Sequence, residues 1–185
     1  MQYGGAIPAQ SLPIPAGEAG VRETLRHMVK ITRAYKAHPL VRETARSVVA
    51  GAADDPGGKA AALQTFVKSE VEYCSDVWDV ETLQTPVVTL GYREPRFGDY
   101  QDGGTASGDC DDQAVCLASL LLSVGVPGAF YAVGLNGEPI SHVMVLARLR
   151  ERLEVNYLAL ETIVPEAGPG WLPPGISSFM LAHFG

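Results

Sequence analysis

The sequence predicts an α+β fold in which a group of helices precedes an antiparallel β-sheet. Four segments before residue 125 place apolar residues at helical spacing, and three strand-like segments follow them. The dipeptide Asn136-Gly137, which favours a hairpin turn, lies between the first two of these strands. Helices grouped ahead of strands that are adjacent in the chain are typical of α+β proteins, so we expect the helices to pack on one sheet.

Residues that end helices help to delimit the predicted helical segments. These segments are residues 21–37, 40–50, 59–73 and 110–124. Pro39 follows the first, and Gly125 is suited to end the last. In the last segment, Ala114, Leu117 and Leu121 recur at spacings of three and four, which predicts a buried helix.

Three strands and two Pro/Gly-rich ends complete the predicted organisation. The strands are residues 129–135, 141–149 and 153–161. Residues 76–107 are rich in Gly, Asp, Pro and Thr without a regular pattern, and a loop of this length is often functional. We expect one domain over residues 21–165, with an extended arm over 1–20 and a tail over 166–185.

The composition indicates a packed domain that does not bind nucleic acid. The chain has 185 residues, of which 46% are hydrophobic and 19% are charged, so a core is available and global disorder is excluded. The formal net charge of −7 repels phosphate groups, which disfavours a nucleic-acid partner. Three cysteines cannot all pair within the chain, so we expect reduced thiols.

Neither export nor membrane insertion is predicted. The first 20 residues lack a basic start followed by an apolar run, so we expect no signal peptide. Residues 114–137 are uncharged and long enough to span a bilayer. However, Gly125, Pro127 and Gly128 interrupt this stretch, which indicates a buried helix followed by a strand.

The segment GDCDDQA, residues 108–114, places a cysteine in the first turn of the buried helix. Unpaired N–H groups and the helix dipole favour an anion there, so the pKa of a thiol at this position can be lowered into the reactive range. Asp109, Asp111 and Asp112 act in the opposite direction, because nearby negative charge raises the pKa of a thiol. Cys110 is therefore a candidate nucleophile that needs a cationic partner, for which histidine is suited.

His142 lies early in one predicted strand, and Glu161 ends the next. If these strands form a hairpin with its turn at residues 151–152, His142 lies opposite Glu161 and Leu146 lies opposite Tyr157. Directly opposed side chains have Cβ atoms about 4.5–5.5 Å apart. The carboxylate could then accept a hydrogen bond from one ring nitrogen and leave the other for the thiol.

This order of cysteine, histidine and acid resembles the transglutaminase-like branch of the papain-like cysteine enzymes. GDCDDQAVCLASLLLSVGVPGAFYAVG resembles the cysteine helix and following strand of that family, SHVMV its histidine strand and ALETIVP its acidic strand. KAAALQTFVKSEVEYCSD resembles the helix before its core. The resemblance covers about residues 59–165 and implies a triad of Cys110, His142 and Glu161, with the cysteine helix packed on an antiparallel sheet.

The chain departs from the family pattern at several positions. The family more often has Asp as the acid, and an aromatic residue often follows its histidine closely, whereas Val143 follows His142 here. The tryptophan that commonly precedes the acid is absent. For the oxyanion, Gln84 is the first candidate donor and Trp78 the second, because both lie in the long segment before the cysteine.

The other residues with reactive groups have ordinary structural interpretations. Cys74 and Cys116 are expected to serve packing. The three aspartates around Cys110 are expected to be helix-start acids that the dipole stabilises. Together with Cys110 and His142 they could instead hold zinc, but no second cysteine lies at a usual ligand spacing. We therefore expect neither a metal nor another cofactor.

The function expected from the residues and the resemblance is cysteine-dependent acyl transfer. The simplest form is a thiol protease or amidase that acts on a peptide or protein. The alternative is a phage virion, tail or assembly protein that keeps the scaffold for binding, because such domains also occur in phage genes. Its terminal arms would then contact phage structural proteins or mediate self-assembly. The expected location is accordingly cytoplasmic or virion-associated.

Overall fold

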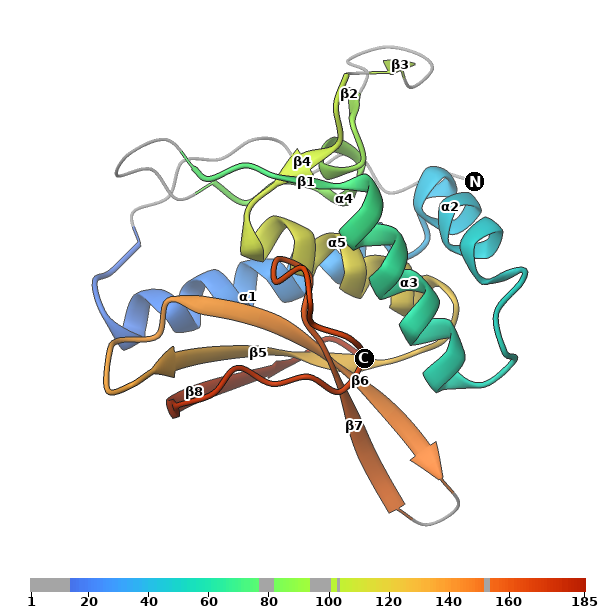
Figure 1. Ribbon diagram of the computed structural model, residues 1–185. Helices are drawn as coiled ribbons and strands as arrows, with labels where there is room; N and C mark the ends of the chain where they lie inside the picture. The colour runs from blue at the N-terminus through green and yellow to red at the C-terminus, as the bar shows by residue number, and fades with distance from the viewer. Residues whose placement is uncertain (1–13, 77–81, 94–100, 103, 152–153) are drawn as a thin grey trace.

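The computed structural model describes residues 14–76, 82–93, 101–102, 104–151 and 154–185. A layer of helices covers one face of a four-stranded sheet (Figure 1). The main helices are α1 (Glu18–Tyr35), α2 (Pro39–Val49), α3 (Pro56–Glu70) and α5 (Cys110–Ser123). This arrangement confirms the predicted α+β fold. Within the described ranges, no helix is long and apolar enough to cross a membrane.

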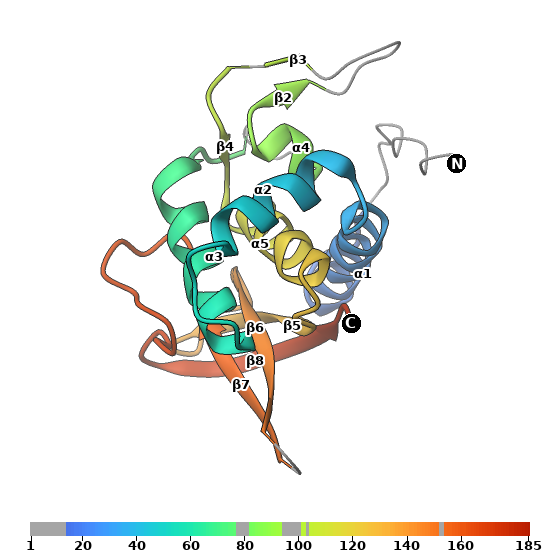
Figure 2. The same cartoon turned by 90° about the vertical axis from the view of Figure 1, so that its right-hand side faces the viewer.

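Helix α5 lies at the centre of the molecule. Figure 2 shows it with α1, α2 and α3 around it and the sheet on its remaining side. Every residue from Asp111 to Leu121 is buried, so the predicted buried helix is covered on all its faces and not only along its apolar stripe. The Asp109 side chain caps the helix, because its Oδ1 accepts hydrogen bonds from the N–H groups of Asp111 (3.2 Å) and Asp112 (3.3 Å).

The first three helices begin earlier than the sequence pattern predicts. Pro39, expected to end the first helix, is instead the first residue of α2, and Pro56 begins α3. Proline is well tolerated at the first helical position, where its missing N–H costs no hydrogen bond. Helix α1 begins at Glu18, inside the expected arm, and residues 1–13 of that arm lie outside the described residues.

The sheet is antiparallel throughout, with the strand order β7-β6-β5-β8. Its strands are β5 (Gly128–Leu135), β6 (His142–Glu151), β7 (Glu154–Leu160) and β8 (Ile176–His183). The core between the sheet and α5 includes the side chains of Phe130, Val145 and Leu160. Asn136 and Gly137, in the predicted turn after β5, both have positive φ angles (54° and 86°).

The β6–β7 register differs from the predicted one by two residues. Leu146 lies opposite Ala159 rather than Tyr157, and Glu151 lies opposite Glu154. Residues 151–152 therefore do not form the two-residue turn that we expected. A shift of two residues keeps every side chain on its predicted face, because side chains alternate with a period of two along a strand.

The expected C-terminal tail contributes the fourth strand of the sheet. Strand β8 pairs with β5, which the sequence analysis did not predict. Met180 and Ala182 of β8 pack against the core, whereas Phe179 and Leu181 on the other face are exposed. The sequence analysis missed this strand for two reasons. A Pro/Gly-rich stretch precedes it, and its partner β5 lies far away in the sequence.

Short elements replace the end of the third predicted helix and part of the predicted loop. Helix α3 ends at Glu70, and β1 (Glu72–Tyr73) pairs in parallel with β4 (Ser107–Gly108). The segment between them also contains α4 (Pro86–Thr89), β2 (Tyr92–Arg93) and β3 (Gln101–Asp102). Such short elements leave no periodic signal in the sequence. The β1–β4 pairing brings the segment after α3 beside the start of α5.

Candidate active site

Cys110 is the first residue of α5 and is half-buried. Strand β4 leads into it, and Gly108 allows the close approach, because a Cβ there would lie 2.5 Å from Cβ of Asp112. The Gly108 carbonyl accepts hydrogen bonds from the N–H of Cys74 (3.1 Å) and from Nε2 of Gln113 (3.3 Å). The thiol thus lies at the N-terminal end of a buried helix, where the dipole favours an anion.

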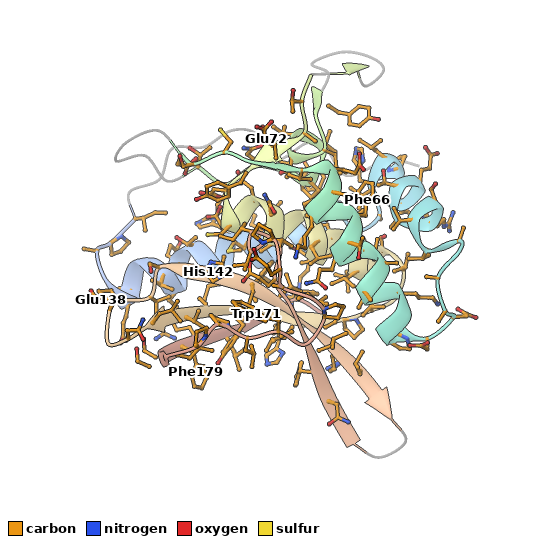
Figure 3. All side chains as sticks on the ribbon, in the orientation of Figure 1. Phe66, Glu72, Glu138, His142, Trp171 and Phe179 are labelled. Atoms are coloured by element: carbon orange, nitrogen blue, oxygen red, sulfur yellow. The ribbon has the colours of Figure 1, made fainter. Side chains whose placement is uncertain are left out.

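His142 is the first residue of β6 and lies between the sheet and the helical layer (Figure 3). It lines the same cavity of about 410 Å³ as Cys110. Asp109 and Ser141 also line this cavity. The helix start and the start of β6, which are far apart in the sequence, therefore border one space.

Glu161 directly follows β7 and is completely buried. Its Oε2 lies 2.6 Å from Nε2 of His142, and its Oε1 accepts a hydrogen bond from the Ile163 N–H (2.9 Å). Both members of the pair lie beyond the last ladder pair of the two strands, Val145 and Leu160, so their contact does not depend on direct opposition. With Nε2 bound to the carboxylate, Nδ1 of His142 remains for a second partner.

Helix α3 fixes the chain around Glu161. Nε2 of Gln64 donates to the Glu161 carbonyl (2.8 Å). Nζ of Lys68 donates to the carbonyls of Val164 (2.8 Å) and Pro165 (3.0 Å). Two side chains that lie one helical turn apart on α3 therefore hold the backbone at and after Glu161.

The environment of Glu161 favours its ionised form. Burial raises the pKa of this carboxyl, but the hydrogen bond and positive charge of His142 act against burial, together with the N–H groups of Ile163 and Thr162. The net result is a pKa below the usual value of a glutamate. A carboxylate in this state can orient the imidazole and stabilise its protonated form.

The three aspartates around Cys110 form a compact acidic group. One carboxylate oxygen from each of Asp109, Asp111 and Asp112 lies within 4.8 Å of the others. Carboxylate oxygens are suited to hard cations such as Ca²⁺, so these are the residues that could hold a metal. Within the described part of the chain, the group includes neither Cys110 nor His142, unlike the zinc alternative considered above.

Asp112 is the buried member of this group with the clearest electrostatic perturbation. Burial raises its pKa to about 7, even though its Oδ1 accepts a hydrogen bond of 2.6 Å from the Gln84 N–H. The negative charge of Asp109 adds to the increase. Among the described residues, Oδ2 of Asp112 has no hydrogen-bond partner.

The two oxyanion candidates have different outcomes. Gln84 is half-buried and binds Asp112 through its backbone, and it is not among the described residues that line the cavity with Cys110. Trp78 lies outside the described residues. The role of either residue as an oxyanion donor stays a prediction.

Tyr73 lines the cavity but was not predicted as a site residue. Burial raises the pKa of its hydroxyl, and the negative charges of Cys110, Asp109 and Asp111 raise it further. The sequence pattern placed Tyr73 at the end of a helix, whereas it belongs to β1. No local signal reveals its position, because the parallel pairing with β4 depends on residues far along the chain.

The other two cysteines differ in their environments, and all three thiols are free. Cys116 is buried in α5, and burial followed by the charge of Asp112 raises its pKa to about 12, which suits a packing residue. Cys74 is exposed, so the expectation that it packs in the interior is wrong. It lies just after β1, whose two residues are exposed, and not within a helix.

Comparisons with known proteins bear on the fold. No family model matches the chain, and no curated protein matches its sequence. Among solved structures, a "putative protease" from Parabacteroides distasonis is similar, with a TM-score of 0.54 and 14% identity over 85% of this chain. The match covers 32% of that protein, so this chain spans about a third of its length.

Two further solved structures are similar at a lower level. A "putative cysteine protease" from Cytophaga hutchinsonii has a TM-score of 0.48 and 14% identity, over 74% of this chain and 42% of that one. LapG from Legionella pneumophila has a TM-score of 0.46 and 16% identity, over 82% of this chain and 80% of that one. None of these matches supports the phage or virion alternative. The chain has the predicted transglutaminase-like fold, with Cys110 at the start of a helix packed on an antiparallel sheet.

Proposed function

We propose that this protein is a cysteine-dependent acyl-transfer enzyme that hydrolyses a peptide or isopeptide bond. The observation that carries the proposal is the 2.6 Å contact between His142 and the buried Glu161, made by a histidine that shares a cavity with Cys110. A nucleophile, a base and a group that orients the base are the parts that such chemistry needs. The fold, which is similar to that of a protein described as a protease, supports the same assignment.

In the proposed first step, His142 accepts the thiol proton of Cys110, and the sulfur attacks the carbonyl carbon of the substrate. The C–N bond then breaks as His142 returns the proton to the departing amine, which leaves a thioester on Cys110. Water, deprotonated by His142, attacks the thioester. The C–S bond breaks, the carboxylic acid leaves, and the proton returns to the sulfur.

Glu161 does not exchange protons in this scheme. It holds the ring of His142 through Nε2 and stabilises the imidazolium that forms in each step. At the start of α5 the Asp109 side chain already accepts hydrogen bonds from the N–H groups of Asp111 and Asp112, so the candidate donor to the oxyanion there is the Cys110 N–H. Gln84 is retained as a further candidate donor.

Alkylation of the native protein by iodoacetamide tests whether Cys110 is activated. Because Cys74 is exposed and would react as well, the measurement uses a Cys74→Ser background, with Cys110→Ser as the blank. We expect Cys110 to react rapidly near pH 7, and His142→Ala to slow this reaction by at least about tenfold. The proposal would be refuted if the alkylation rate of Cys110 is low at pH 7, rises only near the pKa of an ordinary thiol, about 8.5, and is unchanged by His142→Ala.

Hydrolysis and amine transfer are separated by a second measurement. A protein or peptide mixture is incubated with the enzyme in the presence and absence of a fluorescent primary amine. We expect new peptide termini in both conditions and no covalent incorporation of the amine that depends on Cys110. Incorporation without new termini would replace hydrolysis by cross-linking as the activity of the same thiol.

A further inference from the structure

Two glycines fold the chain before α1 tightly against the helix. Gly17 has φ 66° and ψ −151°, a conformation that is essentially restricted to glycine. Its carbonyl accepts hydrogen bonds from the N–H groups of Gly20 (2.9 Å) and Val21 (3.2 Å). At Gly20, a Cβ would lie only 1.9 Å from the carbonyl oxygen of Pro15, so the backbone of this segment lies directly on the helix.

This fold-back makes Ile14 and Pro15 part of the wall of the cavity that contains Cys110 and His142. In Figure 1 the starts of α1, α5 and β6 lie on the same side of the molecule, which agrees with the residues that line the cavity. The apolar part of the wall includes Ile14, Pro15, Leu25, Met28, Ile140 and Val143. These residues belong to the segment that precedes α1, to α1 itself, and to the start of β6 with the residues before it.

The charges on the wall exclude one class of substrate side chain. The acidic residues that line the cavity are Asp109 and Asp111. Among the described residues of the wall, only His142 can carry a positive charge, and it is bound to Glu161. A carboxylate that entered the cavity would lose hydration without gaining a free cation, which is costly.

We propose that this cavity is a specificity subsite that binds an uncharged, apolar side chain of the substrate next to the bond that Cys110 attacks. The inference rests on the proposed function, because the subsite is defined by its continuity with Cys110. The cavity, at about 410 Å³, is within the size range of small-molecule sites. The segment Ile14–Gly17 is thus a specificity element of the enzyme.

The test compares two iodoacetamide derivatives that carry the same reactive group. N-hexyl-iodoacetamide has an apolar tail, and N-(5-carboxypentyl)iodoacetamide has a tail of similar length that ends in a carboxylate. The rates at Cys110 and at Cys74 are measured on the full wild-type chain by peptide mapping. Cys74 is an internal reference, because it is exposed and does not line the cavity.

We expect Cys110 to prefer the hexyl reagent by about tenfold or more, relative to the preference at Cys74. Ile14→Ser and Gly20→Ala should each lower this preference at least about threefold, since the first removes an apolar side chain from the wall and the second displaces Pro15. Leu172→Ser is the matched control, because Leu172 is also an exposed apolar residue but does not line the cavity.

Unsubstituted iodoacetamide separates the inference from the proposed function. If its rate at Cys110 is high and depends on His142, the thiol is activated, and equal preferences at Cys110 and Cys74 overturn only the subsite. Equal effects of Ile14→Ser and Leu172→Ser also overturn it, because Ile14 would then have no special role. If the iodoacetamide rate is low and independent of His142, the proposed function fails, and the inference falls with it.

Discussion

Two buried carboxylates lie next to residues of the candidate site, one in helix α5 and one directly after strand β7, and they differ in what surrounds them. Glu161, on the sheet side, is 0% exposed, and Asp112, on the helix side, is 1% exposed. Glu161 is paired with His142 and with the N–H of Ile163. Asp112 accepts a hydrogen bond from the Gln84 N–H and lies near the negative charge of Asp109.

The comparison shows that burial alone does not determine the charge of a carboxylate. Desolvation raises the pKa of both groups, but at Glu161 the hydrogen bond and charge of His142 outweigh it, whereas the pKa of Asp112 is raised to about 7. The sheet side therefore carries a fixed negative charge for His142. The helix side loses part of its negative charge below neutral pH, which reduces the repulsion of a thiolate at Cys110.

The strongest test of this comparison is Glu161→Gln. Glutamine keeps the shape of the side chain but removes the charge that stabilises the imidazolium, so we expect the rate of peptide hydrolysis to fall by about 10²–10⁴-fold. Glu166→Gln, at an exposed position after the same strand, is the control and should retain full activity. Activity of Glu161→Gln within about threefold of wild type would show that the pair with His142 is only structural.

Asp112→Asn tests the helix side through the pH dependence of unfolding. The pKa of Asp112 is raised in the folded state, so protonated Asp112 stabilises the fold. This contribution to the free energy of unfolding is complete below about pH 4 and is lost as the pH rises towards 7. We expect the variant to be more stable than wild type by about 1–3 kcal/mol at pH 7 and to lose this advantage at pH 4, measured by urea unfolding. An advantage that does not change with pH would mean that Asp112 is ionised throughout.

In the same urea-unfolding measurements, the stability contributed by Glu161 should depend on pH in the opposite direction. Its pKa is lowered on folding, so its contribution is present above the usual glutamate value of 4.5 and is lost as the pH falls below it. Asp112→Asn and Glu161→Gln should therefore change the unfolding profile in opposite directions. Matching profiles would refute the contrast between the two sides.

Local patterns in the sequence were sufficient to predict the positions of the main candidate residues. The helix stripe and its acidic start predicted the location of Cys110, and strand alternation placed His142 and Glu161 at neighbouring strand ends. The two-residue error in the predicted β6–β7 register did not change the face on which any side chain was predicted to lie, because an even shift preserves the faces of both strands. These predictions needed only residues close together in the chain.

The features that the sequence did not reveal all depend on distant partners. Strand β8 needs β5, and Tyr73 reaches the cavity only because β1 pairs with β4. The position of Ile14 depends on the conformation of Gly17 and on the absence of a side chain at Gly20. None of these relations produces periodicity in a single segment, so they became visible only in three dimensions.

Two buried glutamines extend the comparison to the backbone that supports each side. Gln64 donates to the carbonyl of Glu161 on the sheet side, and Gln113 donates to the carbonyl of Gly108 on the helix side. Both are 1% exposed, and among the described residues the Oε1 atom of each has no partner. Replacement of either by leucine removes one hydrogen bond and one unsatisfied acceptor, so we expect stability to change by no more than about 1 kcal/mol.

The two replacements should nevertheless differ in their effect on activity. The Gly108 carbonyl keeps a hydrogen bond from the Cys74 N–H after Gln113→Leu, whereas Gln64→Leu removes a short bond at Glu161 itself. We expect Gln64→Leu to lower kcat about tenfold without changing KM, and Gln113→Leu to lower it about twofold. A loss in Gln64→Leu that is confined to KM would contradict a positioning role, because a group that only orients Glu161 acts on the chemical step and not on substrate binding.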